Sequence, residues 1–212
     1  MKRIIYTLLI ALLAFPSINA QSSKAAIQVV TDMVNVLANN PIQTNFGLLV
    51  QEAATKNKHM MNGVFLMHGN KFMLDTKEMK VYFDGTTQWA YSPSINEVTI
   101  SNPTEKELSE TNPVALIQAY QSKSIIRFAK GNKGRSVHLV ELVPKNKNSD
   151  FRSIIVKVSK ATKYPLHIQM TDKKGNLSAI SLTQFRTGIA TNAKTFTFDA
   201  GVYKDIEIND LR

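Results

Sequence analysis

Apolar and polar residues alternate along most of the chain after residue 40, which is the pattern of β-strands with one buried face. The clearest alternation surrounds the pair Asp84-Gly85. Asp-Gly favours a tight hairpin because glycine adopts a positive φ without a Cβ clash and Asp tolerates it. We therefore expect three consecutive antiparallel strands here. Their apolar faces carry Val81 with Phe83, Trp89 with Tyr91, and Val98 with Ile100.

The same period of two continues on both sides of this hairpin. Before it lie Phe46 with Leu48 and Val50, Phe65 with Met67, and Phe72 with Leu74, the last two pairs being separated by a Gly69-Asn70 turn. After residue 123 the apolar sets include Ile126 with Phe128, Ile154 with Val156, Ile168 with Met170, Ile180 with Leu182, and Phe196 with Phe198. The pattern predicts about eleven strands in one domain. Residues 205–212 are interpreted as a polar tail.

Helical spacing occurs in three places. Near the start, Ser22 or Ser23 can cap an amphipathic helix that Asn39-Asn40-Pro41 ends, and its apolar positions are Ile27, Val30, Val34 and Leu37. Midway, Thr104 can cap a short helix, and Asn112-Pro113 can start a second one. The second contains Leu116, Ile117 and Tyr120.

A twisted sheet of this size must curl, and its apolar face must be covered. Closure into a barrel, a second sheet, or a lid made from the helices would each cover it. The large side chains on the strands then either fill a dry core or line a pocket. Met67 and Met170 have the parity of inward-facing residues, and methionine suits both gap-filling and adaptable binding surfaces.

The first twenty residues have the features of a secretory signal peptide. Lys2 and Arg3 precede the apolar run 4–15, and Ala20 is a plausible cleavage point. We expect a mature domain of residues 21–212 in a bacterial periplasm, because a chain without cysteine has no disulfides and depends on its core. The formal charge of +10 then falls to +8. A solubilising surface is favoured over attraction to an anionic membrane or acidic partner, because the lysines are spread over turns.

The chain carries none of the common catalytic sequence motifs. The chain has no Gly-x-Ser-x-Gly elbow, Gly-rich phosphate loop or His-Glu-x-x-His. His138 and Glu141, three residues apart on a strand, face opposite ways, and the other histidines are isolated. We expect no enzyme activity, no cofactor, no metal and no nucleic-acid partner.

Several short motifs, in order, resemble the periplasmic outer-membrane lipoprotein carriers of the LolA type. They are Gly63-Val64-Phe65-Leu66, Lys71-Phe72, Phe83-Asp84-Gly85, Trp89-Ala90-Tyr91, Asn96-Glu97-Val98, Asn112-Pro113, Phe196-Thr197-Phe198 and Asp210-Leu211-Arg212. The resemblance implies a mainly β fold with an α lid: a single incomplete antiparallel barrel, one N-terminal helix and two short lid helices enclosing a hydrophobic cavity.

The resemblance also implies a binding site for acyl chains. Its expected lining is Phe46, Leu48, Phe65, Met67, Phe72, Leu74, Phe83, Trp89, Tyr91, Val98 and Ile100, with Leu116, Ile117 and Tyr120 in the lid. Phe72 falls where the family has a Phe used in ligand transfer. Where the family commonly has a lid-latching Arg-Pro this chain has Gly69-Asn70, so the polar latch is missing or rebuilt. We expect apolar contacts to hold the lid, at roughly 1 to 3 kcal/mol per buried side chain.

The partners implied by the resemblance are acylated lipoproteins, an inner-membrane lipoprotein-releasing ABC transporter as donor, and an outer-membrane receptor or the membrane surface as acceptor. The carrier itself is expected to be a monomer. Two alternatives stay open: a lipid- or glycolipid-binding sensor or regulatory module on the same fold, and a structural barrel that binds protein but no lipid.

Overall fold

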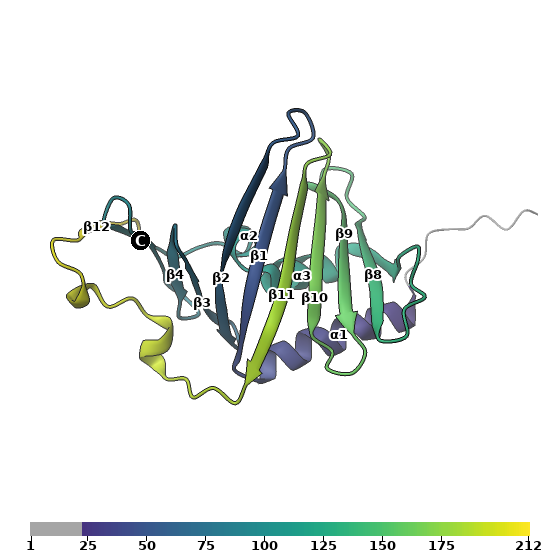
Figure 1. The fold of residues 1–212 in the computed structure, drawn as a ribbon, viewed down its shortest axis with the longest axis horizontal. Coiled ribbons are helices and arrows are strands. Elements are labelled where there is room, and N and C mark those ends of the chain that lie inside the picture. The colour runs from purple at the N-terminus through teal and green to yellow at the C-terminus, as the bar shows by residue number, and fades with distance from the viewer. Residues whose placement is uncertain (1–22) are drawn as a thin grey trace, which may run out of the picture.

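Twelve strands form one continuous sheet that does not close on itself in the computed structural model, which describes residues 23–212 (Figure 1). The strand order is β12-β6-β5-β4-β3-β2-β1-β11-β10-β9-β8-β7, antiparallel at every step except the parallel pair β12 and β6. The strands are β1 (Ile42–Gln51), β2 (Lys58–His68), β3 (Lys71–Thr76), β4 (Lys80–Phe83), β5 (Gln88–Ser92), β6 (Glu97–Ser101), β7 (Ser124–Phe128), β8 (Val137–Pro144), β9 (Phe151–Ser159), β10 (Pro165–Asp172), β11 (Leu177–Thr187) and β12 (Glu207–Asp210). The expected signal peptide lies outside the described residues.

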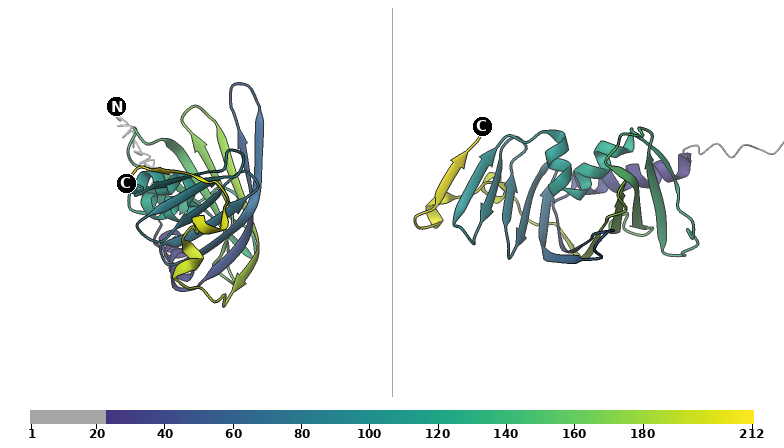
Figure 2. Two further views of the ribbon diagram at one scale, coloured as in Figure 1. Left: turned by 90° about the vertical axis from the view of Figure 1, so that its left-hand side faces the viewer. Right: turned by 90° about the horizontal axis from the view of Figure 1, so that it is seen from above.

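Three α-helices lie on the concave side of the curled sheet (Figure 2). They are α1 (Lys24–Asn39), α2 (Glu105–Thr111) and α3 (Pro113–Gln121). All three begin at the predicted caps: Ser23, Thr104 and Asn112 accept hydrogen bonds from the first turns of their helices. The predicted open barrel with a helical lid is therefore confirmed.

The buried face of α1 is turned slightly from the predicted one. Ala26, Val30, Met33 and Leu37 are buried there. Ile27 and Val34, which were expected on that face, are only partly buried. The sequence pattern allowed either phase, and the contacts of α1 with β2, β7, β8 and α3 select the observed one.

The hairpin at Asp84-Gly85 forms, but as a four-residue loop. Asp84 Oδ1 accepts hydrogen bonds from the backbone N–H groups of Thr86 and Thr87, each at 2.9 Å, and Gly85 has φ +106°. Gly69-Asn70 makes the predicted two-residue turn between β2 and β3, with Gly69 at φ +62°.

The C-terminal chain differs from its prediction because it packs on the convex face of the sheet. Phe196 ends a 3₁₀-helix, η1 (Ala193–Phe196), instead of forming a strand, and only 1% of its surface is exposed. A second 3₁₀-helix, η2 (Ala200–Val202), follows. The expected polar tail contains β12, which extends the sheet beyond β6. Local periodicity did not reveal this pairing, since its partner strand is about a hundred residues away.

None of the helices within residues 23–212 is long and apolar enough to cross a lipid bilayer.

Candidate functional site

A cavity of about 1010 Å³ lies between the concave face of the sheet and the lid helices. Side chains from five strands form its floor: Phe46, Leu48 and Val50 of β1, Met61 and Phe65 of β2, Leu74 of β3, Met170 of β10, and Ile180 and Leu182 of β11. Pro113, Leu116, Ala119 and Tyr120 of α3 form the roof. The floor and roof are apolar, and the volume is at the upper end of the roughly 300 to 1,000 Å³ usual for ligand pockets.

Strand register places these side chains on one face. Phe46 stands opposite Leu182 on one neighbouring strand and opposite Gly63 on the other. Residues directly opposite each other in an antiparallel pair share a face. A Cβ on Gly63 would lie 2.8 Å from the Phe46 ring and 2.3 Å from the Asp75 carbonyl oxygen. The missing side chain of Gly63 therefore leaves room for Phe46 at the cavity floor.

Six of the fourteen predicted site residues line this cavity. They are Phe46, Leu48, Phe65, Leu74, Leu116 and Tyr120. Their parity on the strands and their helical spacing were the signals that identified them.

Four further predicted residues are buried in the core beside the cavity. Phe72 is fully buried, and its ring lies 5.7 Å from that of Phe65 and 5.5 Å from that of Phe83. Met67 and Ile117 are buried in the same cluster. None of these four lines the cavity. Phe72 packs against Phe65, which lines the cavity floor. Direct contact between Phe72 and a ligand would therefore need the core to rearrange.

The remaining four predicted residues face away from the cavity, contrary to the prediction. Tyr82 stands opposite Trp89, and Trp89 stands opposite Ile100. Trp89, Tyr91, Val98 and Ile100 therefore share the convex face with Tyr82, whereas Val81 and Phe83 face the interior. The Tyr91 ring packs 5.4 Å from Phe198 and 4.4 Å from Tyr203, both in the C-terminal chain.

The sequence prediction omitted several lining residues. Val50 and Met170 had the correct parity, and Ile180 with Leu182 formed a recognised apolar set, so a stricter use of alternation would have included all four. Met79 also lines the cavity, but it lies in the turn before β4, where no periodicity indicates direction.

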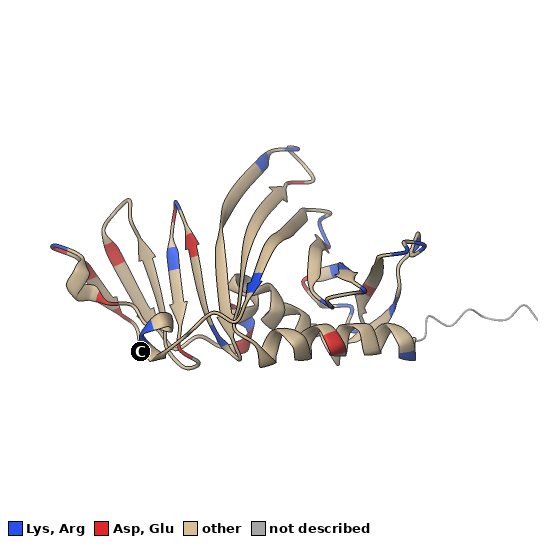
Figure 3. Ribbon diagram, turned by 60° about the horizontal axis from the view of Figure 1, so that its bottom comes forward, with Lys and Arg blue, Asp and Glu red and all other residues tan. Residues whose placement is uncertain are grey.

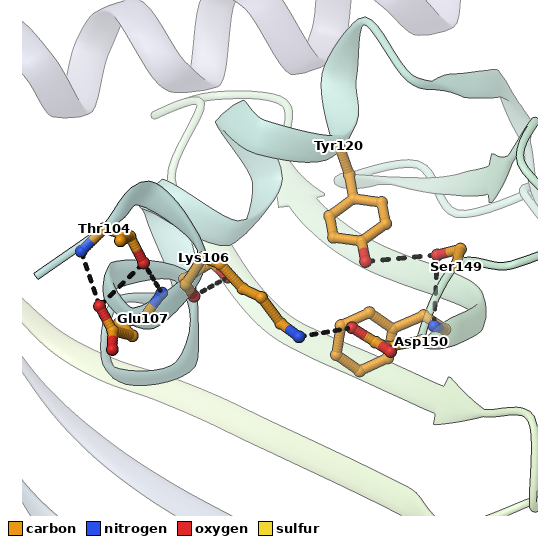
Figure 4. A network of polar contacts seen from close by, with 8 residues as sticks. Thr104, Lys106, Glu107, Tyr120, Ser149 and Asp150 are labelled. Carbon is orange, nitrogen blue, oxygen red and sulfur yellow. Dashed lines mark hydrogen bonds and ion pairs between the residues drawn. The ribbon is translucent and has the colours of Figure 1, made fainter.

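The lid is held to the sheet by polar as well as apolar contacts (Figure 4). Leu116 and Ile117 are buried, as predicted for apolar attachment. In addition, the Ser149 hydroxyl donates to the Tyr120 hydroxyl at 3.3 Å, and the Lys106 ammonium lies 3.7 Å from the Asp150 carboxylate. The Tyr120 ring also meets the Phe151 ring edge to face, 5.6 Å away. A polar latch is thus present, between the lid and the β8–β9 loop rather than at Gly69-Asn70.

A capping box holds the first turn of α2, at the cavity rim. The Thr104 backbone N–H and hydroxyl donate to Glu107 Oε2 at 2.7 and 2.8 Å, and the Glu107 N–H donates back to Thr104 Oγ1. These hydrogen bonds to the charged form lower the pKa of Glu107. The lid helix is therefore held by an ionised carboxylate.

Two of the histidines that the structure describes have shifted pKa values. Burial, together with the nearby ammonium groups of Lys160 and Lys163, lowers the pKa of His138, and burial lowers the pKa of His167. Neither histidine lines the cavity. Among residues 23–212, no group of three His, Asp or Glu side chains is arranged to hold a metal ion. The charged lining residues Glu105, Lys106, Lys123 and Asp150 sit at the rim, so the arrangement is suited to binding an apolar ligand.

Comparison with known proteins agrees with this geometry. Residues 38–199 match the model of the family described as outer membrane lipoprotein carrier protein LolA. The outer-membrane lipoprotein carrier protein of Shewanella frigidimarina is 28% identical over 180 residues, which are 81% of this chain and 80% of that protein. The protein of the same name from Shewanella pealeana is 26% identical over 183 residues, 84% of each chain.

A solved structure shares the fold at much lower sequence identity. An uncharacterized conserved protein from Thermus thermophilus superimposes with a TM-score of 0.55 and 13% identity, over 86% of this chain and 98% of that one.

Proposed function

The chain belongs to the LolA family of outer membrane lipoprotein carrier proteins, and from this premise we propose that it binds the acyl chains of lipoproteins in the cavity and carries them through the periplasm from the inner towards the outer membrane. The observation that carries the proposal is the cavity itself. It is lined by apolar side chains on floor and roof, and its covering helices are fastened at the rim by an exposed ion pair and a partly buried hydrogen bond. An apolar ligand can enter such a site when those contacts part.

The free energy of binding requires that the bound acyl chains stay partly exposed to water. Each buried methylene contributes about 0.8 kcal/mol, and non-covalent affinities reach a ceiling near 20 kcal/mol. Three long acyl chains buried completely would exceed this ceiling and would not be released. We therefore propose that cargo passes directly from the donor to the carrier and from the carrier to the acceptor, rather than through free lipid in water.

The proposed donor is an inner-membrane lipoprotein-releasing ABC transporter, and the proposed acceptor is an outer-membrane receptor or the membrane itself. A single copy has its own cavity and lid, so the carrier is proposed to act as a monomer. Cleavage near Ala20 would release it into the periplasm.

Native mass spectrometry of the protein isolated from its own periplasm tests the cargo. A bound triacylated lipoprotein is the expected result. A free glycolipid as the only bound species would contradict carriage and favour a sensor, and co-purified protein without lipid would favour a structural partner-binding barrel.

Two adjacent residues provide a matched pair of variants for this test. Leu48 lines the cavity, whereas Leu49 points to the opposite face of the same strand, and both are half-buried. Leu48→Glu places a charge among apolar side chains and is expected to abolish cargo binding. Leu49→Glu is expected to retain it. Equal retention of cargo by both variants would show that the cavity is not the binding site.

A further inference from the structure

Eight basic side chains gather at one end of the molecule, around the mouth of the cavity. They belong to the β1–β2 hairpin, the α3–β7 connection, the β8–β9 loop with the start of β9, and the β10–β11 turn, and all eight are exposed. Figure 1 shows the β1–β2 and β10–β11 tips side by side at the top, and Figure 3 shows Lys or Arg at the tip of the tall β1–β2 hairpin. This basic mouth surface consists of Lys56, Lys58, Lys123, Lys145, Lys147, Arg152, Lys173 and Lys174.

Contacts between the loops join these residues into one surface. The Ala53 N–H donates to Asn176 Oδ1 at 2.9 Å, which fixes the β1–β2 hairpin against the β10–β11 turn. The Lys173 ammonium donates to the Lys147 carbonyl, and the Lys145 N–H donates to the Lys123 carbonyl at 2.9 Å. Lysines that are far apart in the sequence are therefore held together in space.

The positive charge of this surface is not neutralised locally. Its loops carry eight cations and three carboxylates, Glu52, Asp150 and Asp172, which gives a net charge of +5. Asp150 already faces Lys106, and Asp172 accepts two hydrogen bonds from Asn176 at 2.8 and 2.7 Å. Among the side chains that the structure describes, none of the eight cations pairs with a carboxylate.

The same end of the molecule contains the opening of the cavity. Val50, Asn146 and Ser178 line the cavity, and each lies next to one of the basic loops. A partner that covers the basic mouth surface therefore also faces the cavity. We propose that this surface docks the protein on an anionic phospholipid bilayer, with the cavity mouth turned towards the membrane.

The chemistry of the surface favours a bilayer over an acidic protein. Seven of the eight cations are lysines, which are flexible point charges without the fixed fork that recognises one carboxylate or phosphate in a set geometry. They project from separate loops, as suits a mobile array of lipid phosphates. Each Lys or Arg near an anionic bilayer surface strengthens binding by about fivefold. Docking does not depend on acyl-chain binding, so the empty protein should also dock.

Vesicle binding by the purified protein without its expected signal peptide (residues 21–212) tests the proposal. The probes are vesicles of phosphatidylcholine alone and of phosphatidylcholine mixed with phosphatidylglycerol, and binding is measured by co-sedimentation at low and high salt. The mouth variant carries Lys→Gln at positions 56, 58, 147 and 174. The matched control carries Lys→Gln at 130, 133, 160 and 163, in the β7–β8 and β9–β10 loops at the opposite end, where the Lys160 N–H donates to the Ser136 carbonyl.

The wild-type protein is expected to bind the mixed vesicles only, and to be released by salt that screens the charges. The mouth variant should bind at least about tenfold more weakly, and the control variant within about twofold of wild type. Equal losses in both variants would overturn the proposal by showing that only net charge matters. No binding to mixed vesicles at low salt would also overturn it and assign the surface to an acidic protein partner. Fatty-acid uptake by the mouth variant in solution, measured separately, reports on the proposed carrier function alone.

Discussion

The ammonium group of Lys106, in the first turn of α2, lies 3.7 Å from the carboxylate of Asp150 in the β8–β9 loop. This pair and the Tyr120–Ser149 hydrogen bond connect the lid to the sheet across the rim of the cavity. Both partners of the ion pair are mostly exposed, so it contributes at most about 1 kcal/mol to stability. Its position gives it a larger role in opening the lid than in holding the fold.

Breaking this latch is expected to speed ligand exchange without unfolding the protein. Lys106→Ala combined with Tyr120→Phe should raise the release rate of a fluorescent fatty acid by about fivefold, because both contacts must part for the lid to move. Stopped-flow transfer to acceptor vesicles measures this rate. Lys77→Ala, in the exposed β3–β4 turn, is the control. An unchanged rate in the double variant would show that apolar contacts alone set the barrier.

Acid is expected to loosen the start of the lid through Glu107. The pKa of Glu107 is lowered by hydrogen bonds from Thr104. A carboxyl group with a depressed folded-state pKa stabilises the fold above its unfolded value, here near 4.5, and this contribution is lost as the pH falls through the folded pKa. Fatty-acid release should therefore accelerate below that pH in the wild type, and Glu107→Gln should flatten the profile. Superimposable profiles for the wild type and Glu107→Gln would show that Glu107 is not the source of the acid response.

The fluorescence emission of Trp89 is expected to stay unchanged when a ligand binds. It is the only tryptophan in the chain, and its strand partner Tyr82 places it on the face away from the cavity. Palmitate should leave its emission maximum unchanged. In a Trp89→Phe background, Leu48→Trp places the reporter in the cavity and should give a blue shift on binding. A clear shift in the emission maximum of Trp89 in the wild-type protein would be evidence that the convex face takes part in binding.

Gly63→Ala is expected to destabilise the protein by about 1 to 3 kcal/mol through overpacking. The new methyl group would lie 2.3 Å from the Asp75 carbonyl oxygen, which belongs to the neighbouring strand and cannot easily move. Gly47→Ala is the control, since its Cβ would meet only the side-chain oxygen of Asn62, at 3.0 Å. Urea denaturation compares the two. Similar stabilities would mean that β3 shifts to accommodate the methyl group.

Phe196→Ala is expected to cost about 3 to 5 kcal/mol, the usual penalty for removing a buried aromatic ring. The ring is 1% exposed, although it lies in a short 3₁₀-helix on the convex face. Val202→Ala, at a side chain that is 72% exposed, should change stability by less than about 0.5 kcal/mol. Thermal unfolding measures both variants. A small effect at Phe196 would show that the C-terminal chain is only loosely attached to the sheet.

Local features of the fold were fixed by the sequence alone. The caps at Ser23, Thr104 and Asn112 and the turns at Gly69 and Gly85 depend on side chains and backbone angles within a few residues, which a sequence pattern displays directly. Alternation likewise identified most of the strands and four of the residues that line the cavity, and helical spacing identified Leu116 and Tyr120.

Only the tertiary structure decided which face of each strand meets the cavity. Strands β4 to β6 are covered on both faces, on one by the core and on the other by the C-terminal chain, and alternation cannot distinguish two buried sides. The register of β4 and β5 and the parallel pairing of β12 with β6 determine which face of these strands meets the cavity. The basic mouth surface depends on tertiary structure in the same way. Its lysines are scattered over turns in the sequence and meet because antiparallel pairing brings alternate turns to the same end of the sheet.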